Sequence, residues 1–522
     1  MHPNLTHTSM SITVRTALAA AALLAAAALP PRSPAHAARA VQPAAYQPRF
    51  QSTACPFKLG AGLVAARDVR CGVLVVPENR AAPSGRSVTL AVAIFKSPAL
   101  DRAPDPVVFL QGGPGGAIVG QLGPSIDATA LPLITGRHDF ILIDQRGTGY
   151  SQPSLACPEL TQLQYATLDQ NLSARQTVAR ETTADQACHA RLVRAGIDLN
   201  AYTTAADAAD VADLRRALGY ATMDLYGVSY GTRLALTTMR LYPQGLRSVV
   251  LDSVVRPQSD NFSDPLRSMA RAFATLFQGC AADHACATAY PRLDQEFYAL
   301  VTRLNAAPVS FRVTSSDTGK RYTALLTGDG LTTLLFQSLY ATALIPSLPQ
   351  MIDDLRRGDD TLAAHNYGLV EFDNSVSIGL YYAVQCGEDA PFTTRAAIAA
   401  AAQALPPALR ADQLIGSLGE LSQCGIWKVK SVSPAAKQTV RSAIPTLVLA
   451  GQYDPITPPA HSAAVARALR HGYFYQFPGT GHGVFLTAAC PYRITAAFTD
   501  DPAHSPDTGC IAGMTGPKFT TR

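Results

Sequence analysis

The sequence predicts an α/β fold, in which a mostly parallel sheet is flanked by helices. Two observations lead to this prediction. Short apolar segments recur along the chain, and each of them ends in a polar or glycine-rich loop. Residues capable of catalysis follow several of these segments directly, and open α/β sheets place their ligands at the carboxyl ends of the strands.

The expected strands follow in chain order. Residues 107–110 run into a glycine cluster, and residues 140–143 run into the polar segment 144–147. A helix is expected over 205–219, because apolar residues recur there at helical spacing behind Thr204, whose hydroxyl suits an N-cap. The other strands expected in the sheet are 223–227, 246–251, 446–450 and 473–477.

The pentapeptide from Gly227 to Gly231 predicts a nucleophile elbow. It has the pattern G-x-S-x-G and lies between an apolar strand and a helix-forming segment. A serine hydroxyl is a weak nucleophile at neutral pH, so it must be held clear of the backbone and beside a base. The sharp turn does this for Ser229, and the flanking glycines let neighbouring backbone pass close by.

Chain order predicts a catalytic triad of Ser229, Asp454 and His482. Hydrolases with a nucleophile elbow use serine, acid and histidine in this order, and these three residues follow successive predicted strands. His482 is the expected general base, and Asp454 is expected to orient it and to stabilise its charged form. The structural alternatives are a turn residue for Asp454 and a loop residue for His482. Asp252 also ends a strand after the serine and is the alternative acid.

The glycine cluster at 112–116 predicts an oxyanion hole. It lacks the Gly-Lys-Ser/Thr of a phosphate-binding loop, and Pro114 disrupts a dinucleotide fingerprint. The backbone N–H of Gly113 is the expected first donor to the tetrahedral intermediate, and the N–H of Tyr230 is the second. A flexible turn is the structural alternative for this cluster.

Together these motifs resemble those of a group of serine exopeptidases, the proline iminopeptidases and tripeptidyl aminopeptidases. The similarity extends from about residue 50 to the C-terminus. The chain departs from the group at Gln111, where proline iminopeptidases usually have His, and at Ala117, where the secreted aminopeptidases often have Ser. The matching segments are 111–116, 144–149, 227–231, 451–454 and 481–483.

The resemblance implies an α/β-hydrolase fold with an inserted, largely helical cap. It also implies cleavage of short peptides or amino-acid amides from a free N-terminus. The chain between Ser229 and Asp454 is far longer than the one or two strand-helix units that a minimal core needs, and Ala/Leu-rich helical patterns fill it. We expect the core at 50–259 and 436–522, interrupted by a cap at 260–435.

An enzyme that recognises a free N-terminus needs a carboxylate in the cleft to pair with the substrate ammonium. Residues 386–389 are similar to a Cys-x-Glu-Asp run of the exopeptidases, which implies that Glu388 binds this ammonium. Glu371 and Asp373 are the alternative carboxylates. The structural alternative for Glu388 is a helix cap or a pair with an arginine on the cap surface.

The N-terminus predicts a signal peptide over 1–37. Arg15 precedes an apolar stretch at 17–29, and an Ala-His-Ala cleavage site follows at 35–37. The apolar stretch is shorter than the roughly 20 residues that span a bilayer. Residues 38–50 are expected to form a flexible leader, and the mature protein is expected to be secreted or periplasmic.

Cysteine usage agrees with export. All ten cysteines follow Ala37, and an even number in an exported chain favours disulfides over free thiols. No C-x-x-C spacing is present, so neither a zinc site nor a thioredoxin-like motif is predicted. The sequence does not fix the connectivity, but pairing of neighbours would give Cys55–Cys71, Cys157–Cys188, Cys280–Cys286, Cys386–Cys424 and Cys490–Cys510.

The formal net charge of +5 is spread without long basic runs, so neither nucleic acid nor a membrane surface is an expected partner. No cofactor is implied, because the triad supplies its own nucleophile and base. The expected function is that of a secreted serine hydrolase that releases N-terminal amino acids or short (tri)peptides through an acyl-enzyme. Two alternatives stay open: a carboxylesterase with the same triad and a non-catalytic binding protein on a hydrolase fold. Substrate length and oligomeric state stay open as well.

Overall fold

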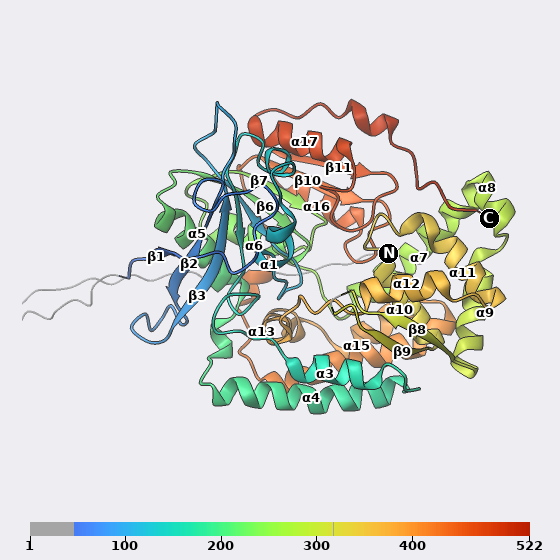
Figure 1. The fold of residues 1–522 in the computed structure, drawn as a ribbon. Helices are drawn as coiled ribbons and strands as arrows, with labels where there is room; N and C mark the ends of the chain where they lie inside the picture. Colours follow the sequence, from blue (N-terminus) through green and yellow to red (C-terminus); the bar gives the residue numbers. More distant parts are fainter. Residues whose placement is uncertain (1–45, 317, 522) are drawn as a thin grey trace, which may run out of the picture. The chain divides into compact units, whose positions relative to one another are not determined.

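The computed structural model describes residues 46–316 and 318–521. In this part of the chain nine strands form one sheet: β1 (Arg49–Ser52), β2 (Val69–Pro77), β3 (Ser87–Phe95), β4 (Val107–Leu110), β5 (Phe140–Ile143), β6 (Met223–Val228), β7 (Leu246–Asp252), β10 (Thr446–Gly451) and β11 (Gly472–Phe477). Their order across the sheet is β1-β2-β3-β5-β4-β6-β7-β10-β11. Figure 1 labels β1 to β3 and β6, β7, β10 and β11 of this sheet. The strands from β5 to β11 in this order pair in parallel, whereas β1, β2 and β3 pair antiparallel.

The parallel strands are nearly continuous runs of buried residues, as expected for strands that helices cover on both faces. Every residue of β10 is buried, and β6 is buried as far as Gly227. The helices that connect or follow the parallel strands are α1 (Val119–Leu122), α2 (Leu131–Thr135), α3 (Pro158–Thr167), α4 (Ala174–Arg194), α5 (Thr204–Leu218), α6 (Tyr230–Leu241), α16 (Pro459–Ala468) and α17 (Ala489–Asp500).

Helices pack against the parallel strands of the sheet. Ile494 and Phe498 of α17 share an apolar cluster with Tyr226, Val250 and Phe477 from β6, β7 and β11. The helix α6 packs against β6 and against α5. Because β6, β7, β10 and β11 are parallel neighbours, their carboxyl ends lie at one edge of the sheet.

Between β7 and β10 the chain forms helices and one small antiparallel hairpin. The elements are α7 (Asp264–Ala282), α8 (His284–Ala289), α9 (Leu293–Ala306), β8 (Val309–Thr314), β9 (Arg321–Leu326), α10 (Gly328–Ser338), α11 (Leu348–Arg357), α12 (Thr361–Val370), α13 (Ile378–Glu388), α14 (Arg395–Ala402) and α15 (Pro407–Trp427). Figure 1 draws them in colours from green to orange. Much of this segment shares one apolar cluster, with Phe273, Phe297, Leu335 and Met351 among its buried members. We propose that it acts as a cap with the boundaries 260–435.

The strands expected from sequence are confirmed to within about one residue. Three features differ. The antiparallel strands β1 to β3 were not predicted, and Arg49 and Phe50, assigned to the leader, already belong to β1. The N-cap of α5 is Thr203, whose hydroxyl accepts the N–H of Ala206, and not Thr204, which is the first helical residue.

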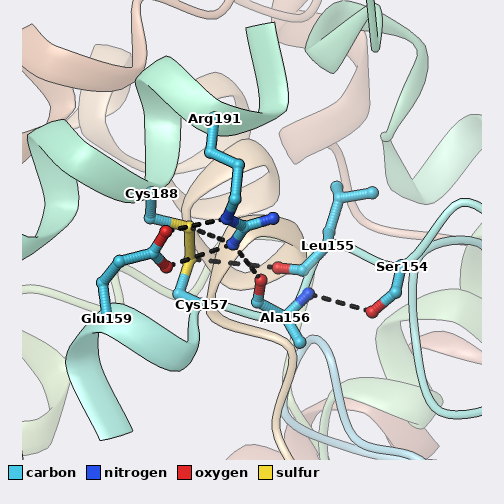
Figure 2. The surroundings of a disulfide bond; sticks show 7 residues. All are labelled: Ser154, Leu155, Ala156, Cys157, Glu159, Cys188 and Arg191. Atoms are coloured by element: carbon cyan, nitrogen blue, oxygen red, sulfur yellow. Dashed lines mark hydrogen bonds and ion pairs between the residues drawn. A yellow bond between two sulfur atoms is a disulfide. The ribbon is translucent and has the colours of Figure 1, made fainter. Parts of the chain in front are cut away.

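Five disulfides join Cys55–Cys71, Cys157–Cys188, Cys280–Cys286, Cys386–Cys424 and Cys490–Cys510, so pairing of neighbours is confirmed. Residues 46–316 and 318–521 contain no free cysteine. Figure 2 shows the bridge from Cys157, just before α3, to Cys188 on α4, with the ion pair of Glu159 and Arg191 beside it. Because Arg191 also donates to the carbonyl of Ala156, this corner is held by covalent and polar contacts together.

The predicted signal peptide lies outside the described residues, as does the leader up to residue 45. Among the helices of the described residues, none is both long and apolar enough to span a bilayer.

Candidate active site

Ser229 lies at a sharp turn between β6 and α6. Its backbone has φ 57° and ψ −125°, a conformation that a residue with a side chain adopts only at a cost. The flanking glycines make the turn feasible. A Cβ on Gly227 would lie 2.4 Å from the carbonyl oxygen of Gly231, and a Cβ on Gly231 would lie 1.9 Å from that of Leu110. The backbone is therefore that of the expected nucleophile elbow.

The structure brings His482 and Asp454 into contact. Nδ1 of His482 lies 2.9 Å from Oδ2 of Asp454. Thr457 supports the carboxylate, since its hydroxyl donates to Oδ2 at 2.6 Å and its N–H donates to Oδ1 at 2.8 Å. Tyr340, just after α10, accepts the N–H of His482 with its carbonyl at 3.0 Å, and its ring meets the imidazole edge-on at 4.9 Å.

Electrostatics favour a charged pair at this contact. Burial opposes ionisation of the imidazole, but the Asp454 carboxylate, with a smaller contribution from Asp252, outweighs it and raises the pKa of His482 above its ordinary value. Burial also opposes ionisation of Asp454, yet the nearby His482 and the bonds from Thr457 lower its pKa overall. The arrangement stabilises an imidazolium, the species that forms when a histidine acts as general base.

Asp252, the alternative acid, has different partners. Its Oδ2 accepts from the phenol of Tyr226 at 2.6 Å and from the N–H groups of Val484 and Phe485 at 2.8 and 3.2 Å. These contacts fix the loop that follows His482. Asp252 therefore supports the histidine loop, whereas Asp454 contacts the ring.

The histidine loop also lies beside the elbow. A Cβ on Gly483 would lie 3.4 Å from Cγ2 of Val228, the residue before Ser229. The N–H of Gly483 donates to the hydroxyl of Ser253 at 2.9 Å. A Cβ on Gly451 would lie 1.8 Å from the carbonyl oxygen of Gly481, so the end of β10 passes directly against the same loop.

The glycine cluster passes close to Ser229. A Cβ on Gly112 would lie 2.7 Å from Cβ and 3.2 Å from Oγ of Ser229. Gly113 has φ 116°, in the region that favours glycine. Tyr230 is the first residue of α6, where a backbone N–H has no acceptor within the helix. In the described residues, neither the N–H of Gly113 nor that of Tyr230 donates to a protein acceptor.

Glu388, the last residue of α13, lies in the interior with 5% of its surface exposed. Its Oε1 accepts the N–H of Thr204 at 2.7 Å, and its Oε2 accepts the Thr204 hydroxyl, also at 2.7 Å. Burial raises the pKa of Glu388, against the opposing effect of the Arg233 charge. Its role in binding a substrate ammonium stays a prediction, and both carboxylate oxygens are engaged by Thr204.

Glu371 and Asp373 line a cavity of about 990 Å³, formed with residues of α3, α4, α13 and α15. Glu181 and Glu420 line it too, and burial raises the pKa of Glu420 to about 7. Among the described residues that line the cavity, Arg180 is the one cation, and its guanidinium donates to Gln170.

This cavity borders the glycine cluster. Val376, one of its lining residues, forms a β-bridge with Gly116, and the N–H of Ser377 donates to the carbonyl of Gly115. A Cβ on Gly115 would lie 2.6 Å from the carbonyl oxygen of Ser377, so the two backbones are in direct contact.

Three supporting residues were not predicted from the sequence. Thr457 follows Asp454 by three positions, a spacing at which a side-chain carboxylate commonly accepts backbone and hydroxyl protons, so a local signal existed. Tyr340 and Ser253 reach the histidine loop from distant parts of the chain, and nothing in the local sequence marks that contact.

The chain is similar to known proteins, and one family model matches most of its length. Residues 105–489 match the family model of the alpha/beta hydrolase fold. The serine protease Hip1 of Mycobacterium tuberculosis is 26% identical over 449 residues, which cover 82% of this chain and 84% of that protein. A tripeptidyl aminopeptidase of Streptomyces lividans is 30% identical over 203 residues, 37% of each chain. A solved thermophilic esterase from Thermogutta terrifontis is 16% identical, with a TM-score of 0.33 over 82% of this chain and 97% of its own.

Proposed function

The chain belongs to the alpha/beta hydrolase family, as a serine peptidase-like hydrolase, and we propose that it releases N-terminal amino acids or short peptides from substrates with a free N-terminus. In this proposal Ser229 is the nucleophile, His482 the general base and Asp454 the acid of the triad. The observation that carries it is the 2.9 Å contact between His482 and Asp454 beside the strained elbow at Ser229.

The proposed reaction starts with attack of the Ser229 hydroxyl on the scissile carbonyl. His482 accepts the serine proton at Nε2, because Nδ1 is engaged by Asp454. The oxyanion of the tetrahedral intermediate accepts hydrogen bonds from the N–H groups of Gly113 and Tyr230. Collapse of the intermediate breaks the C–N bond, and His482 returns the proton to the leaving amine. A water molecule then gives a proton to His482 and attacks the carbonyl of the acyl-enzyme. Collapse of this second tetrahedral intermediate breaks the C–O bond to Ser229, and His482 returns the proton to the serine oxygen.

The specificity for a free N-terminus rests on the acidic cavity. A substrate ammonium that enters it would meet Glu371 and Asp373, next to the loop that contacts the glycine cluster. A charge-assisted hydrogen bond of this kind contributes about 1.5–3 kcal/mol. Glu371 and Asp373 line this space, whereas the carboxylate of Glu388 is engaged by Thr204, so we favour the first two for the ammonium.

A substrate panel tests the proposal. We would compare aminoacyl, dipeptidyl and tripeptidyl chromogenic amides, each free and N-acetylated, with simple acyl esters, using Ser229→Ala as the inactive control. The free peptidyl amides should have the highest kcat/KM. Because an extended chain spans about 3.5 Å per residue, the preferred length reports the distance from the ammonium site to Ser229. Equal rates on blocked and free amides would refute the exopeptidase proposal, and hydrolysis of esters alone would point to a carboxylesterase.

We also propose that the protein is exported. The predicted signal peptide at 1–37 and the five disulfides support this, since disulfides persist in oxidising compartments. Peptide substrates outside the cytoplasm would then reach the enzyme directly.

A further inference from the structure

The end of α13 contacts the first turn of α6 at two places. Glu388 reaches it through Thr204, whose hydroxyl oxygen lies 2.8 Å from the phenol oxygen of Tyr230. Asp389 reaches it directly, because its Oδ2 accepts from Nη1 of Arg233 at 2.9 Å. Tyr230 and Arg233 are three positions apart and share one helix face. Both contacts therefore fall on the turn that immediately follows Ser229.

The hydrogen bonds through Thr204 have one consistent direction. Both oxygens of Glu388 accept from Thr204, one from its N–H and the other from its O–H. The Thr204 hydroxyl has a single proton, which leaves its oxygen to accept from the phenol of Tyr230. The chain thus runs from Tyr230 through Thr204 to Glu388, and all three side chains are at most 5% exposed. The other neighbour of the phenol, Oδ2 of Asp207, is more distant at 3.4 Å.

Two cations lie beside the carboxylates at the end of α13. Asp389 lies between Arg233 and Lys437 and pairs with both cations. Arg233 and Lys437 also donate to the carbonyl of Ser259. Glu388 and Asp389 therefore face two cations in the interior, a setting in which removal of one partner is strongly destabilising.

We propose that Glu388 and Thr204 are positioning residues that fix Tyr230 and, with it, the backbone N–H that stabilises the oxyanion. The inference rests on the proposed function, in which this N–H is an oxyanion donor. An effective donor lies roughly 2.7–3.1 Å from the oxyanion, so a small shift of Tyr230 weakens the contact. The Tyr230 hydroxyl is held by Thr204, which is held in turn by Glu388 at the end of α13, so the side chain of Tyr230 transmits a change at either residue to its backbone.

Two substitutions test the hydrogen-bond chain by removing a hydroxyl group while keeping the shape of the side chain. Thr204→Val keeps the shape of the side chain and removes its hydroxyl, and Tyr230→Phe keeps the ring and the backbone N–H. Each should lower kcat about ten-fold with KM nearly unchanged, less than the 10²–10³-fold loss typical of deleting an oxyanion donor. Thr204→Ser should restore most of kcat. Tyr165→Phe is the matched control at wild-type kcat, since the Tyr165 hydroxyl has no hydrogen-bond partner in the described residues.

A transition-state mimic gives a second measurement. A peptidyl trifluoromethyl ketone bonds through its carbonyl carbon to the Ser229 oxygen, the serine proton passes to His482, and the ketone oxygen becomes an oxyanion. Its inhibition constant should rise in Thr204→Val and Tyr230→Phe by the factor by which kcat/KM falls. Affinity for the product peptide, which has no oxyanion, should stay at the wild-type value. Thermal unfolding shows whether each variant is folded.

The outcomes are distinct. Wild-type kcat and ketone affinity in both variants would overturn the inference, as would equal losses of ketone and product affinity. Glu388→Gln should lose activity equally on free and N-acetylated amides, and a loss confined to free amides would assign Glu388 to substrate binding instead. Wild-type protein whose Ser229 reacts neither with the ketone nor with a phosphonylating probe would refute the proposed function itself.

Discussion

The imidazole of His482 contacts Asp454 at 2.9 Å, while Asp252 holds the two residues after Gly483 through their N–H groups. Two buried carboxylates at strand ends thus serve one histidine in different ways. One contacts the ring, and the other contacts the backbone of its loop.

Because the two carboxylates have different contacts, we expect Asp454→Asn and Asp252→Asn to lower kcat by different factors. Asp454→Asn should lower kcat by about 10⁴-fold, because an amide does not stabilise the imidazolium or fix its tautomer. Asp252→Asn should lower kcat far less, because the ring of His482 keeps its contact with Asp454. Steady-state kinetics on one chromogenic amide checks both variants, with circular dichroism as the test of folding. The reverse order of losses would move the acid to Asp252.

The pH dependence of activity follows from the imidazole. The general base must be neutral, and the nearby Asp454 outweighs burial and raises the pKa of His482 above 6.5. We expect kcat/KM to rise with pH, with a midpoint above 6.5. A pH series at constant ionic strength measures it. A midpoint below that value would show that burial outweighs the carboxylate.

The variant Glu371→Gln tests the proposed ammonium site. Burial raises the pKa of Glu371, and Oε1 accepts from Nε2 of Gln164 at 3.2 Å. Glu371→Gln should reduce kcat/KM for free peptidyl amides by about ten- to a hundredfold, as expected for the loss of a charge-assisted contact. The N-acetylated amide serves as the internal control and should be nearly unaffected. Equal losses on both substrates would mean that Glu371 has only a structural role.

Asp185 on α4 should make stability depend on pH. Neither of its oxygens has a hydrogen-bond partner in the described residues, and burial together with Glu181 raises the pKa of Asp185 to about 7. A raised pKa in the folded state means that this group favours folding below its unfolded pKa of about 3.9, and that the benefit disappears as pH rises through about 7. Asp185→Asn should therefore raise Tm at pH 8 and change it little at pH 4.

Asp169→Asn provides the matched control, because Asp169 is exposed and the change in charge is the same. Differential scanning calorimetry at both pH values makes the comparison. A stabilisation by Asp185→Asn that is independent of pH, or one shared by Asp169→Asn, would contradict the prediction.

The ten cysteines and the leader predict two properties of the mature protein, its first residue and its lack of free thiols. It should begin near Ala38 and contain no free thiol. Mass spectrometry of the secreted protein, alkylated before and after reduction, checks both points. Two or more cysteines alkylated without reduction would contradict the pairing, and an intact N-terminus would contradict the signal peptide.

The parts of the fold that sequence predicted are those with a strong local signal. The strands that precede Ser229, Asp454 and His482 are apolar runs that end in loops of special composition. The order of serine, acid and histidine along the chain then predicted that these three residues form a triad. The antiparallel strands β1 to β3 and the hairpin β8–β9 carry weaker patterns, and their pairing is set by distant partners. For the same reason the bond from Thr204 to Glu388 was not foreseen, since 184 positions separate the two residues.

The backbone around His482 depends on the inserted segment. Gly481 donates its N–H to the Thr342 hydroxyl, and His482 donates to the Tyr340 carbonyl. A shortened enzyme made by excising residues 260–435 would lose both acceptors and the aromatic neighbour of the imidazole. An exchange of this segment between relatives must therefore include the turn at 339–342 and keep its hydrogen bonds to Gly481 and His482. Under the proposed function, a change of the inserted segment that alters substrate selection would therefore also alter the backbone that holds the imidazole of His482.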